Sequence, residues 1–236
     1  MKKHIPNFVT SLNLLSGCIG IGLVFRGYLG IAAYMIGIAA VFDFLDGMVA
    51  RLLHVKSEIG KELDSLADVV SFGVLPGLIV YSLLDIVFRD SVGLNTFIPF
   101  IAFIIPVFSA LRLAKFNIDT RQTESFIGLP TPANAIFFAS IPLILLHQPD
   151  EIPFISAMLG NPAVLLILVF LFSFLLVSPL PLFSMKFKDL SWKQNYMQYI
   201  LIGASVILII VLQFLAIPII LLLYILLSII KNSNKK

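Results

Sequence analysis

Charged residues are scarce in this sequence, and cysteine is almost absent. Charged side chains make up 12% of the 236 residues, whereas soluble domains carry roughly 25%. A soluble domain needs charged and polar side chains to cover its surface, so this shortage excludes an ordinary water-soluble globule. Cys18 is the single cysteine, which excludes an intramolecular disulfide and a cysteine-based metal site.

Long apolar runs occupy most of the chain instead. Hydrophobic residues make up 59% of the sequence, the mean hydropathy is +1.04, and a membrane-crossing helix needs about 20 mainly apolar residues. This length predicts six spans, at residues 6–25, 28–50, 62–88, 95–116, 131–147 and 162–178. The apolar stretch from Tyr199 to Ile230 is too long for one straight span, and Gln213 and Pro218 near its middle favour a hairpin of two short helices.

The sequence therefore predicts an all-α, polytopic integral membrane helix bundle with six core transmembrane helices and a C-terminal hairpin, eight helices in total. We expect one membrane-embedded domain over residues 1–236, with a core at 1–195 and the hairpin at 196–230. All Lys and Arg residues except Arg26 and Arg89 fall on one side of this arrangement, which is the cytoplasmic side by the positive-inside rule. Both termini are then cytoplasmic, in a multi-pass protein of the cell inner membrane.

The basic residues sit at the edges of the apolar runs and form no basic face interleaved with aromatic residues. Their placement is therefore explained by membrane topology, and no nucleic-acid partner is expected.

Four aspartates lie near the cytoplasmic ends of the second and third predicted helices. Asp43 and Asp46 are three residues apart and Asp64 and Asp68 are four apart, so each pair lies on one helix face. An ionised aspartate in a membrane span costs about 3 kcal/mol, and four packed together repel one another. Divalent cations would offset both effects. All-oxygen ligation suits Mg²⁺ or Mn²⁺, and four carboxylates can hold a two-metal centre for phosphoryl chemistry.

Three alternatives are open for the aspartates and the small residues beside them. A single aspartate at a helix end is most often an interfacial residue or an N-cap. A carboxylate cluster also suits a cation or proton-coupled transporter, although such sites usually lie near the membrane midplane on broken helices. Small residues beside the aspartates, such as Gly47 and Ala50, serve close helix packing as readily as ligand access.

Residues 43 to 68 read DxxDGxxAR, eight residues, then GxxxDxxxD, which resembles the signature of the CDP-alcohol phosphotransferase family at every fixed position. The resemblance implies a membrane enzyme that displaces CMP from a CDP-linked alcohol with an acceptor hydroxyl. It also implies that Asp43, Asp46, Asp64 and Asp68 bind two Mg²⁺ or Mn²⁺ ions and that Asp68 is the general base. The implied CDP pocket is lined by Gly47, Ala50, Arg51 and Gly60, with Ser57, Asn7 and Thr10 as weaker candidates.

Three further segments, residues 5–17, 111–117 and 126–133, are similar to the phosphatidylserine synthase branch of that family. This similarity implies CDP-diacylglycerol as the donor and L-serine as the acceptor, among membrane lipids. An amino-acid carboxylate needs a basic partner near the metals, so Arg112 and Lys115 are candidates for acceptor binding, with Thr131 as a secondary one. The alternative acceptors are glycerol 3-phosphate and an inositol phosphate. Self-association into a homodimer is left open.

Overall fold

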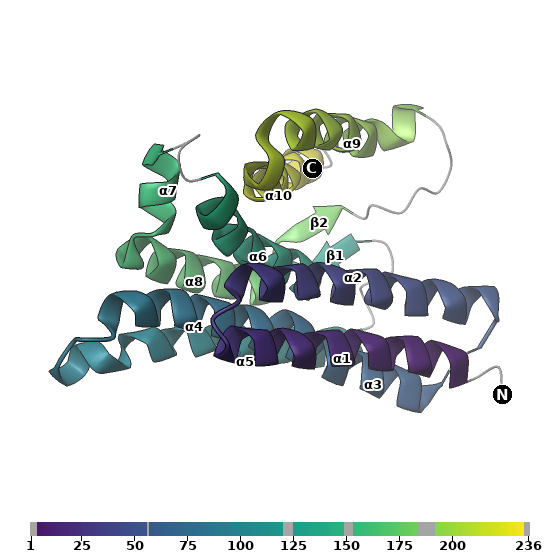
Figure 1. Ribbon diagram of the computed structural model, residues 1–236. Coiled ribbons are helices and arrows are strands. Elements are labelled where there is room, and N and C mark those ends of the chain that lie inside the picture. Colours follow the sequence, from purple (N-terminus) through teal and green to yellow (C-terminus); the bar gives the residue numbers. More distant parts are fainter. Residues whose placement is uncertain (1–3, 56, 120–124, 149–152, 184–191, 234–236) are drawn as a thin grey trace.

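The computed structural model describes residues 4–55, 57–119, 125–148, 153–183 and 192–233, and these are mainly helical (Figure 1). The first half of the chain contains α1 (His4–Phe25), α2 (Leu29–Leu52), α3 (Glu58–Asp68), the π-helical turn η1 (Val69–Val74), α4 (Leu75–Phe88), the 3₁₀ segment η2 (Gly93–Phe103) and α5 (Ile104–Ile118). The second half contains β1 (Ser125–Ile127), α6 (Thr131–His147), α7 (Pro153–Leu159), α8 (Pro162–Val177), β2 (Pro181–Phe183), α9 (Trp192–Leu212), the 3₁₀ turn η3 (Gln213–Leu215) and α10 (Ala216–Ser233).

The expected all-α, polytopic class is confirmed. Within the described residues, five segments are long and apolar enough to cross a membrane, and six if the bent pair α7 and α8 forms one span. α6 follows the expected residues 131–147 but has 17 residues, short of the tested span length. The total of eight spans therefore stays a prediction.

The structure corrects three local expectations. The third helix begins at Glu58 and runs to Phe88, with η1 inside it. The fourth begins as the 3₁₀ segment η2, which contains Pro99. The ring of a proline inside an α-helix clashes with the carbonyl four residues earlier, so Pro99 disfavours a regular α-helix there. The helix α7 and the strand pair β1–β2 were not expected; β1 and β2 are antiparallel, with Phe126 opposite Leu182.

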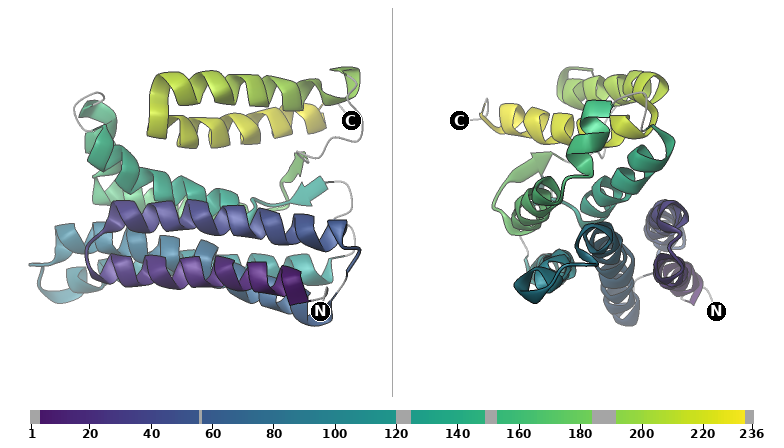
Figure 2. Two further views of the ribbon diagram at one scale, coloured as in Figure 1. Left: turned by 45° about the vertical axis from the view of Figure 1, so that its right-hand side comes forward. Right: turned by 60° about the vertical axis from the view of Figure 1, so that its left-hand side comes forward.

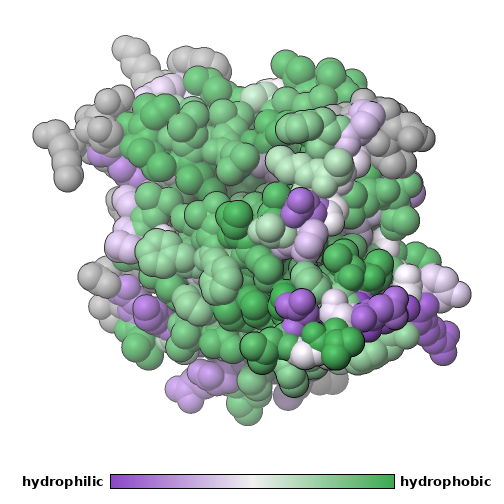
Figure 3. Space-filling model, turned by 90° about the vertical axis from the view of Figure 1, so that its left-hand side faces the viewer, coloured by the Kyte–Doolittle hydropathy of each residue, from purple (hydrophilic) through white to green (hydrophobic). Residues whose placement is uncertain are grey.

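The helices form layers along a common long axis. In Figures 1 and 2, α9 and α10 form an antiparallel hairpin on one side of the molecule, α1 and α3 lie on the other, and α6 and α8 lie between them. The hairpin turns at Gln213, which has a φ of 48°, and this matches the break expected there. The end of the molecule opposite the strand pair is shown in Figure 3, where hydrophobic residues cover most of the face and hydrophilic residues form separate groups.

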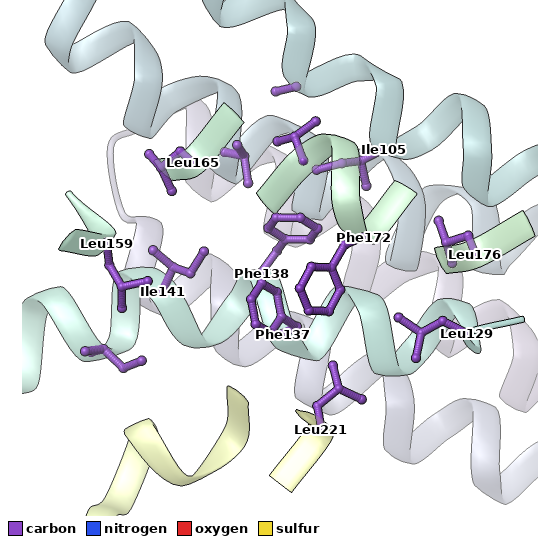
Figure 4. Packing of buried hydrophobic residues seen from close by; sticks show 14 of the residues in the cluster. Ile105, Leu129, Phe137, Phe138, Ile141, Leu159, Leu165, Phe172, Leu176 and Leu221 are labelled. Carbon is purple, nitrogen blue, oxygen red and sulfur yellow. The ribbon is translucent and has the colours of Figure 1, made fainter. Parts of the chain in front are cut away.

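A cluster of aromatic and aliphatic side chains joins the layers (Figure 4). Phe137 of α6 stacks on Phe172 of α8 with ring centroids 3.8 Å apart, and Phe138 meets the same ring edge-on at 5.9 Å. Ile105 of α5 and Leu221 of α10 belong to this cluster too. The core thus ties the C-terminal hairpin to the central helices.

α1 lies unusually close to η1 because of a glycine. A Cβ built on Gly17 would lie 2.5 Å from the Oγ of Ser71 and 3.0 Å from its Cα. The Ser71 hydroxyl donates a hydrogen bond to the backbone oxygen of Asn13 at 3.0 Å. Small residues that allow helices to approach closely are a common basis of packing in membranes.

Replacing Gly17 with alanine should therefore destabilise the protein, by about 1 to 3 kcal/mol if the helices must separate. Gly22 on the same helix is the matched control, because a Cβ built there meets nothing within 4 Å. Thermal unfolding of the purified protein in detergent measures the difference. Equal unfolding temperatures for G17A and G22A would contradict the close contact.

Candidate functional site

A sharp turn between α2 and α3 brings the two acidic helix faces together. His54 has a φ of 51°, its N–H donates to the Arg51 oxygen at 3.2 Å, and the Val55 N–H donates to the Ala50 oxygen at 3.1 Å. This pair of bonds is the Schellman motif, which ends a helix with one residue in the left-handed region. Ser57 then caps α3 by accepting a hydrogen bond from the Gly60 N–H at 3.2 Å.

Three of the four predicted aspartates meet at this end of the bundle. Asp43 of α2 and Asp64 and Asp68 of α3 each offer a carboxylate oxygen, and these oxygens all lie within 4.8 Å of one another. Asp68 is 7% exposed. The π-helical turn η1 begins directly after it, and such turns widen a helix, frequently at functional sites.

Asp46 lies beside these three carboxylates but outside the 4.8 Å group. It is close enough to Asp43 and Asp64 for their charges to repel, and its Oδ2 accepts a hydrogen bond from the Thr10 hydroxyl at 2.6 Å. Thr10, a candidate for nucleotide binding, thus contacts Asp46 directly.

Asn13 was not expected among the site residues. It is fully buried, and its Nδ2 donates a hydrogen bond to Oδ1 of Asp68 at 3.2 Å. Its spacing gave a usable signal, because Asn7, Thr10 and Asn13 recur every three residues in a mainly apolar helix and so share one face.

The chemistry of the carboxylate group fits a hard divalent cation. Oδ1 of Asp64 is buried and has no hydrogen-bond partner among the described residues. The Arg112 guanidinium is near enough to attract Asp43 and Asp68, yet the described residues include no direct ion pair between them. An oxygen-only group with a surplus of negative charge and an unpaired buried oxygen is what Mg²⁺ or Mn²⁺ requires.

A cavity of about 640 Å³ opens beside the carboxylates. Its lining includes most of the residues expected to bind the CDP group, namely Asn7, Thr10, Gly47, Ala50, Ser57 and Gly60, together with Asp46 and Asp64. A Cβ on Gly47 would meet nothing within 4 Å, so Gly47 leaves the backbone open to a ligand. Lys61 also lines this cavity and was not expected. Arg51 is exposed and does not line it; its Nε donates to the Gly47 oxygen at 2.9 Å.

A second cavity, of about 470 Å³, lies between the end of α5 and the end of α8. Arg112, Lys115 and Asp119 supply its charged groups, and Ile127 and Ser178 also line it. Arg112 is 8% exposed, its Nε has no hydrogen-bond partner within the described part of the chain, and its guanidinium lies 5.0 Å from the Phe116 ring centre. Thr131, the third candidate for acceptor binding, is fully buried and does not line this cavity.

The sequence was compared with models of known protein families. The sequence model of the CDP-alcohol phosphatidyltransferase family matches residues 3–231. The chain belongs to the CDP-alcohol phosphatidyltransferase family. The resemblance drawn from residues 43–68 is thereby confirmed at the level of the family.

The chain is also similar to curated members of this family. It is 38% identical over 133 residues to the CDP-diacylglycerol–serine O-phosphatidyltransferase of Helicobacter pylori J99, a match that covers 56% of this chain and 54% of that protein. It is 36% identical over 148 residues to the Bacillus subtilis protein of the same name, covering 61% and 75%. An archaetidylserine synthase of Methanothermobacter thermautotrophicus is 35% identical over 141 residues, covering 58% and 56%. The match to the first of these spans about half of that relative's length.

Binding of Mg²⁺ or Mn²⁺ should stabilise the protein through the carboxylate group. A ligand at about 100 times its Kd adds roughly 2.7 kcal/mol, so Mn²⁺ should raise the unfolding temperature of the wild type. D64N should lose this shift because it removes one of the three close carboxylates, whereas D85N should keep it. Asp85 pairs with Arg89 at 3.5 Å and does not belong to the group. An unchanged Mn²⁺ shift in D64N would place the ion elsewhere.

The left-handed backbone at His54 gives a separate prediction about the turn. A residue with a Cβ is strained there by about 1 kcal/mol relative to glycine, so H54G should raise the free energy of unfolding by about that amount. H54V should lower it, since a β-branched residue fits this region worst. Thermal unfolding of both variants measures the effect, and destabilisation by H54G would refute the strain.

Proposed function

We propose that this protein transfers the phosphatidyl group from CDP-diacylglycerol to the hydroxyl of L-serine, which gives phosphatidylserine and CMP. The observation that carries the proposal is a carboxylate group flanked by two cavities of different chemistry. One cavity is lined by small and polar residues together with three carboxylates and Lys61, and the other is lined by Arg112, Lys115 and Asp119 beside mainly apolar residues.

The larger cavity suits the CDP group of the donor. Gly47 and Ala50 have little or no side chain to block a nucleotide. The Lys61 ammonium donates to the Asn117 oxygen at 3.0 Å, and as a lining residue Lys61 would place its positive charge near a diphosphate. Asn7 and Thr10 add hydrogen-bonding groups from α1. The carboxylates at the edge of this cavity would hold two divalent ions, with Asp46 completing the set of four.

The smaller cavity suits an amino-acid acceptor. Arg112 and Lys115 would bind the serine carboxylate, and Asp119 would bind its ammonium group. A zwitterion needs both signs of charge in one site, whereas a phosphorylated acceptor calls for positive charge alone. The names of the bacterial and archaeal relatives above share a serine product, which supports serine as the acceptor.

Asp68 is placed to act as the general base. Asn13 donates a hydrogen bond to Oδ1 of Asp68. The buried Arg112 attracts Asp68 and also lines the smaller cavity. The serine hydroxyl oxygen forms a bond to the lipid-side phosphorus, its proton passes to Asp68, and the bond from that phosphorus to the CMP oxygen breaks. Bound divalent ions would supply neutralisation of the diphosphate charge.

We place the carboxylate end of the bundle at the cytoplasmic face of the membrane, with both termini on that side. Lys61, Arg112 and Lys115 surround the two cavities, and basic residues gather at cytoplasmic ends. The first turn of α1 and the last turn of α10 lie toward the same end as the strand pair (Figure 2). A lipid donor and a water-soluble acceptor can both reach a site at this depth.

CMP release by the purified protein in detergent tests the proposal. With CDP-diacylglycerol and Mn²⁺, release should require L-serine, stop on chelation and disappear in D68N. Ethanolamine lacks the carboxylate and 3-hydroxypropanoate lacks the ammonium, so both should be poor acceptors. R112Q should raise the KM for serine about thirtyfold or more, because it leaves a carboxylate without its charged partner. R89Q, at an exposed arginine, is the control and should leave the KM unchanged.

Two outcomes would contradict the proposal in different ways. Release of CMP with glycerol 3-phosphate or an inositol phosphate but not with serine would keep the family and change the acceptor. No CMP release with any acceptor, together with Mn²⁺ flux into sealed vesicles, would instead favour a cation transporter.

A further inference from the structure

The strand β2 has two edges, and each is covered by a different part of the chain. One edge pairs with β1, where Ile127 lies opposite Pro181 and Ser125 opposite Phe183. The other edge faces α10. A buried strand edge must have its backbone groups satisfied, and a proline there helps, because it has no N–H that needs a partner.

Three polar side chains of α10 meet this second edge. Tyr224, Ser228 and Asn232 are four residues apart and so lie on one helix face. The Tyr224 hydroxyl donates to the Phe183 oxygen at 2.8 Å, and the Phe183 N–H donates to the Ser228 hydroxyl at 3.5 Å. The Asn232 Nδ2 donates to the Pro181 oxygen at 2.6 Å. We call these three residues the α10 ladder.

Ring contacts strengthen this attachment. The ring of Phe183 meets the ring of Tyr224 edge-on at 5.1 Å. Lys231 of the same helix places its ammonium 5.0 Å from the Phe183 ring centre. Both contacts favour one fixed position of β2 against α10.

The position of β2 in turn determines one wall of the smaller cavity. The end of α8 contributes Val177 to that wall, the residues that lead into β2 contribute Ser178 and Pro179, and β1 contributes Ile127. The Gly128 N–H donates to the Leu180 oxygen at 2.9 Å. A Cβ on Gly128 would lie 2.4 Å from the Leu176 oxygen. The two segments are therefore packed against each other with no spare room.

We propose that the α10 ladder is a positioning device for the smaller cavity, so that the C-terminal hairpin sets the affinity for the acceptor without touching it. The inference rests on the assignment of that cavity to the acceptor. Tyr224, Ser228 and Asn232 act through β2 and are positioning residues. The larger cavity is lined by α1, α2, α3 and the α2–α3 turn, so the donor site does not depend on the ladder.

The opposite end of the hairpin offers a matched control. Gln148 is 2% exposed; its Nε2 donates to the Leu212 oxygen at 3.2 Å and its Oε1 accepts from the Leu215 N–H at 3.2 Å. It holds the turn between α9 and α10 far along the helices from the strand pair. Q148A removes both of these bonds and leaves the bonds between α10 and β2 in place.

The test compares the double variant Y224F/N232A with Q148A in the CMP-release assay. Y224F keeps the ring on Phe183 and removes only the hydroxyl, and N232A removes the bond to Pro181. The double variant should raise the KM for serine about fivefold or more, with kcat at saturating serine and the KM for CDP-diacylglycerol changed less than about twofold. Q148A should lower the unfolding temperature and leave the KM for serine unchanged. N232Q keeps the amide and, paired with Y224F, should recover part of the affinity.

The outcomes separate this inference from the proposed function. The positioning role alone is overturned if the wild type is active and the double variant keeps the wild-type KM for serine. It is also overturned if the KM values of the double variant for serine and for CDP-diacylglycerol rise together. An equal rise of the serine KM in Q148A also overturns it, since that result means a general loss of packing. If the folded wild type releases no CMP with serine, the assignment of the smaller cavity to serine is wrong. The proposed positioning role of the α10 ladder then fails as well.

Discussion

Mutual repulsion of carboxylates in an apolar helix bundle is the constraint on which the rest of the structure depends. Three carboxylate oxygens lie within 4.8 Å of one another, and charges at such distances repel more strongly where the surroundings are less polar than water. Asn13 and Thr10 offset part of the cost by donating hydrogen bonds to Asp68 and Asp46, and Arg112 adds a positive charge. Since no direct ion pair is described there, a divalent cation is the natural remaining counter-charge. The close packing of Gly17 against Ser71 keeps Thr10 and Asn13, the hydrogen-bond donors of α1, in place.

Local patterns predicted the helices and the acidic faces, because both depend on residues close in sequence. The expected α6 matches residues 131–147, and the 3- and 4-residue spacings of the aspartates place Asp43, Asp64 and Asp68 in one group. Contacts between distant segments could not be predicted in this way. The bond from Asn13 to Asp68 joins residues 55 apart in the chain. The strands β1 and β2 have three residues each, too few for an alternating pattern to appear.

Arg112 links the smaller cavity to the carboxylate group. It lines the smaller cavity and attracts Asp43 and Asp68 of the carboxylate group. A charged side chain that is 8% exposed is stable only with partners for its charge. The carboxylates supply part of that partnership, and the Phe116 ring lies 5.0 Å from the guanidinium. The smaller cavity and the carboxylate group therefore share one electrostatic system, although different helices build them.

The C-terminal hairpin has no sequence motif, but the spacing of its polar residues indicates how it packs. Polar side chains in an apolar helix are costly unless they form hydrogen bonds, so their spacing indicates what the helix packs against. The four-residue spacing of Tyr224, Ser228 and Asn232 corresponds to a rise of about 6 Å along the helix, and alternate residues of a strand lie about 6.6 Å apart. Pro181 and Phe183 are two residues apart in β2, so a helix face of this spacing can satisfy successive backbone groups along a strand edge. The same reasoning explains why the third member of the pattern faces a proline: its single acceptor needs one donor, and Asn232 provides it.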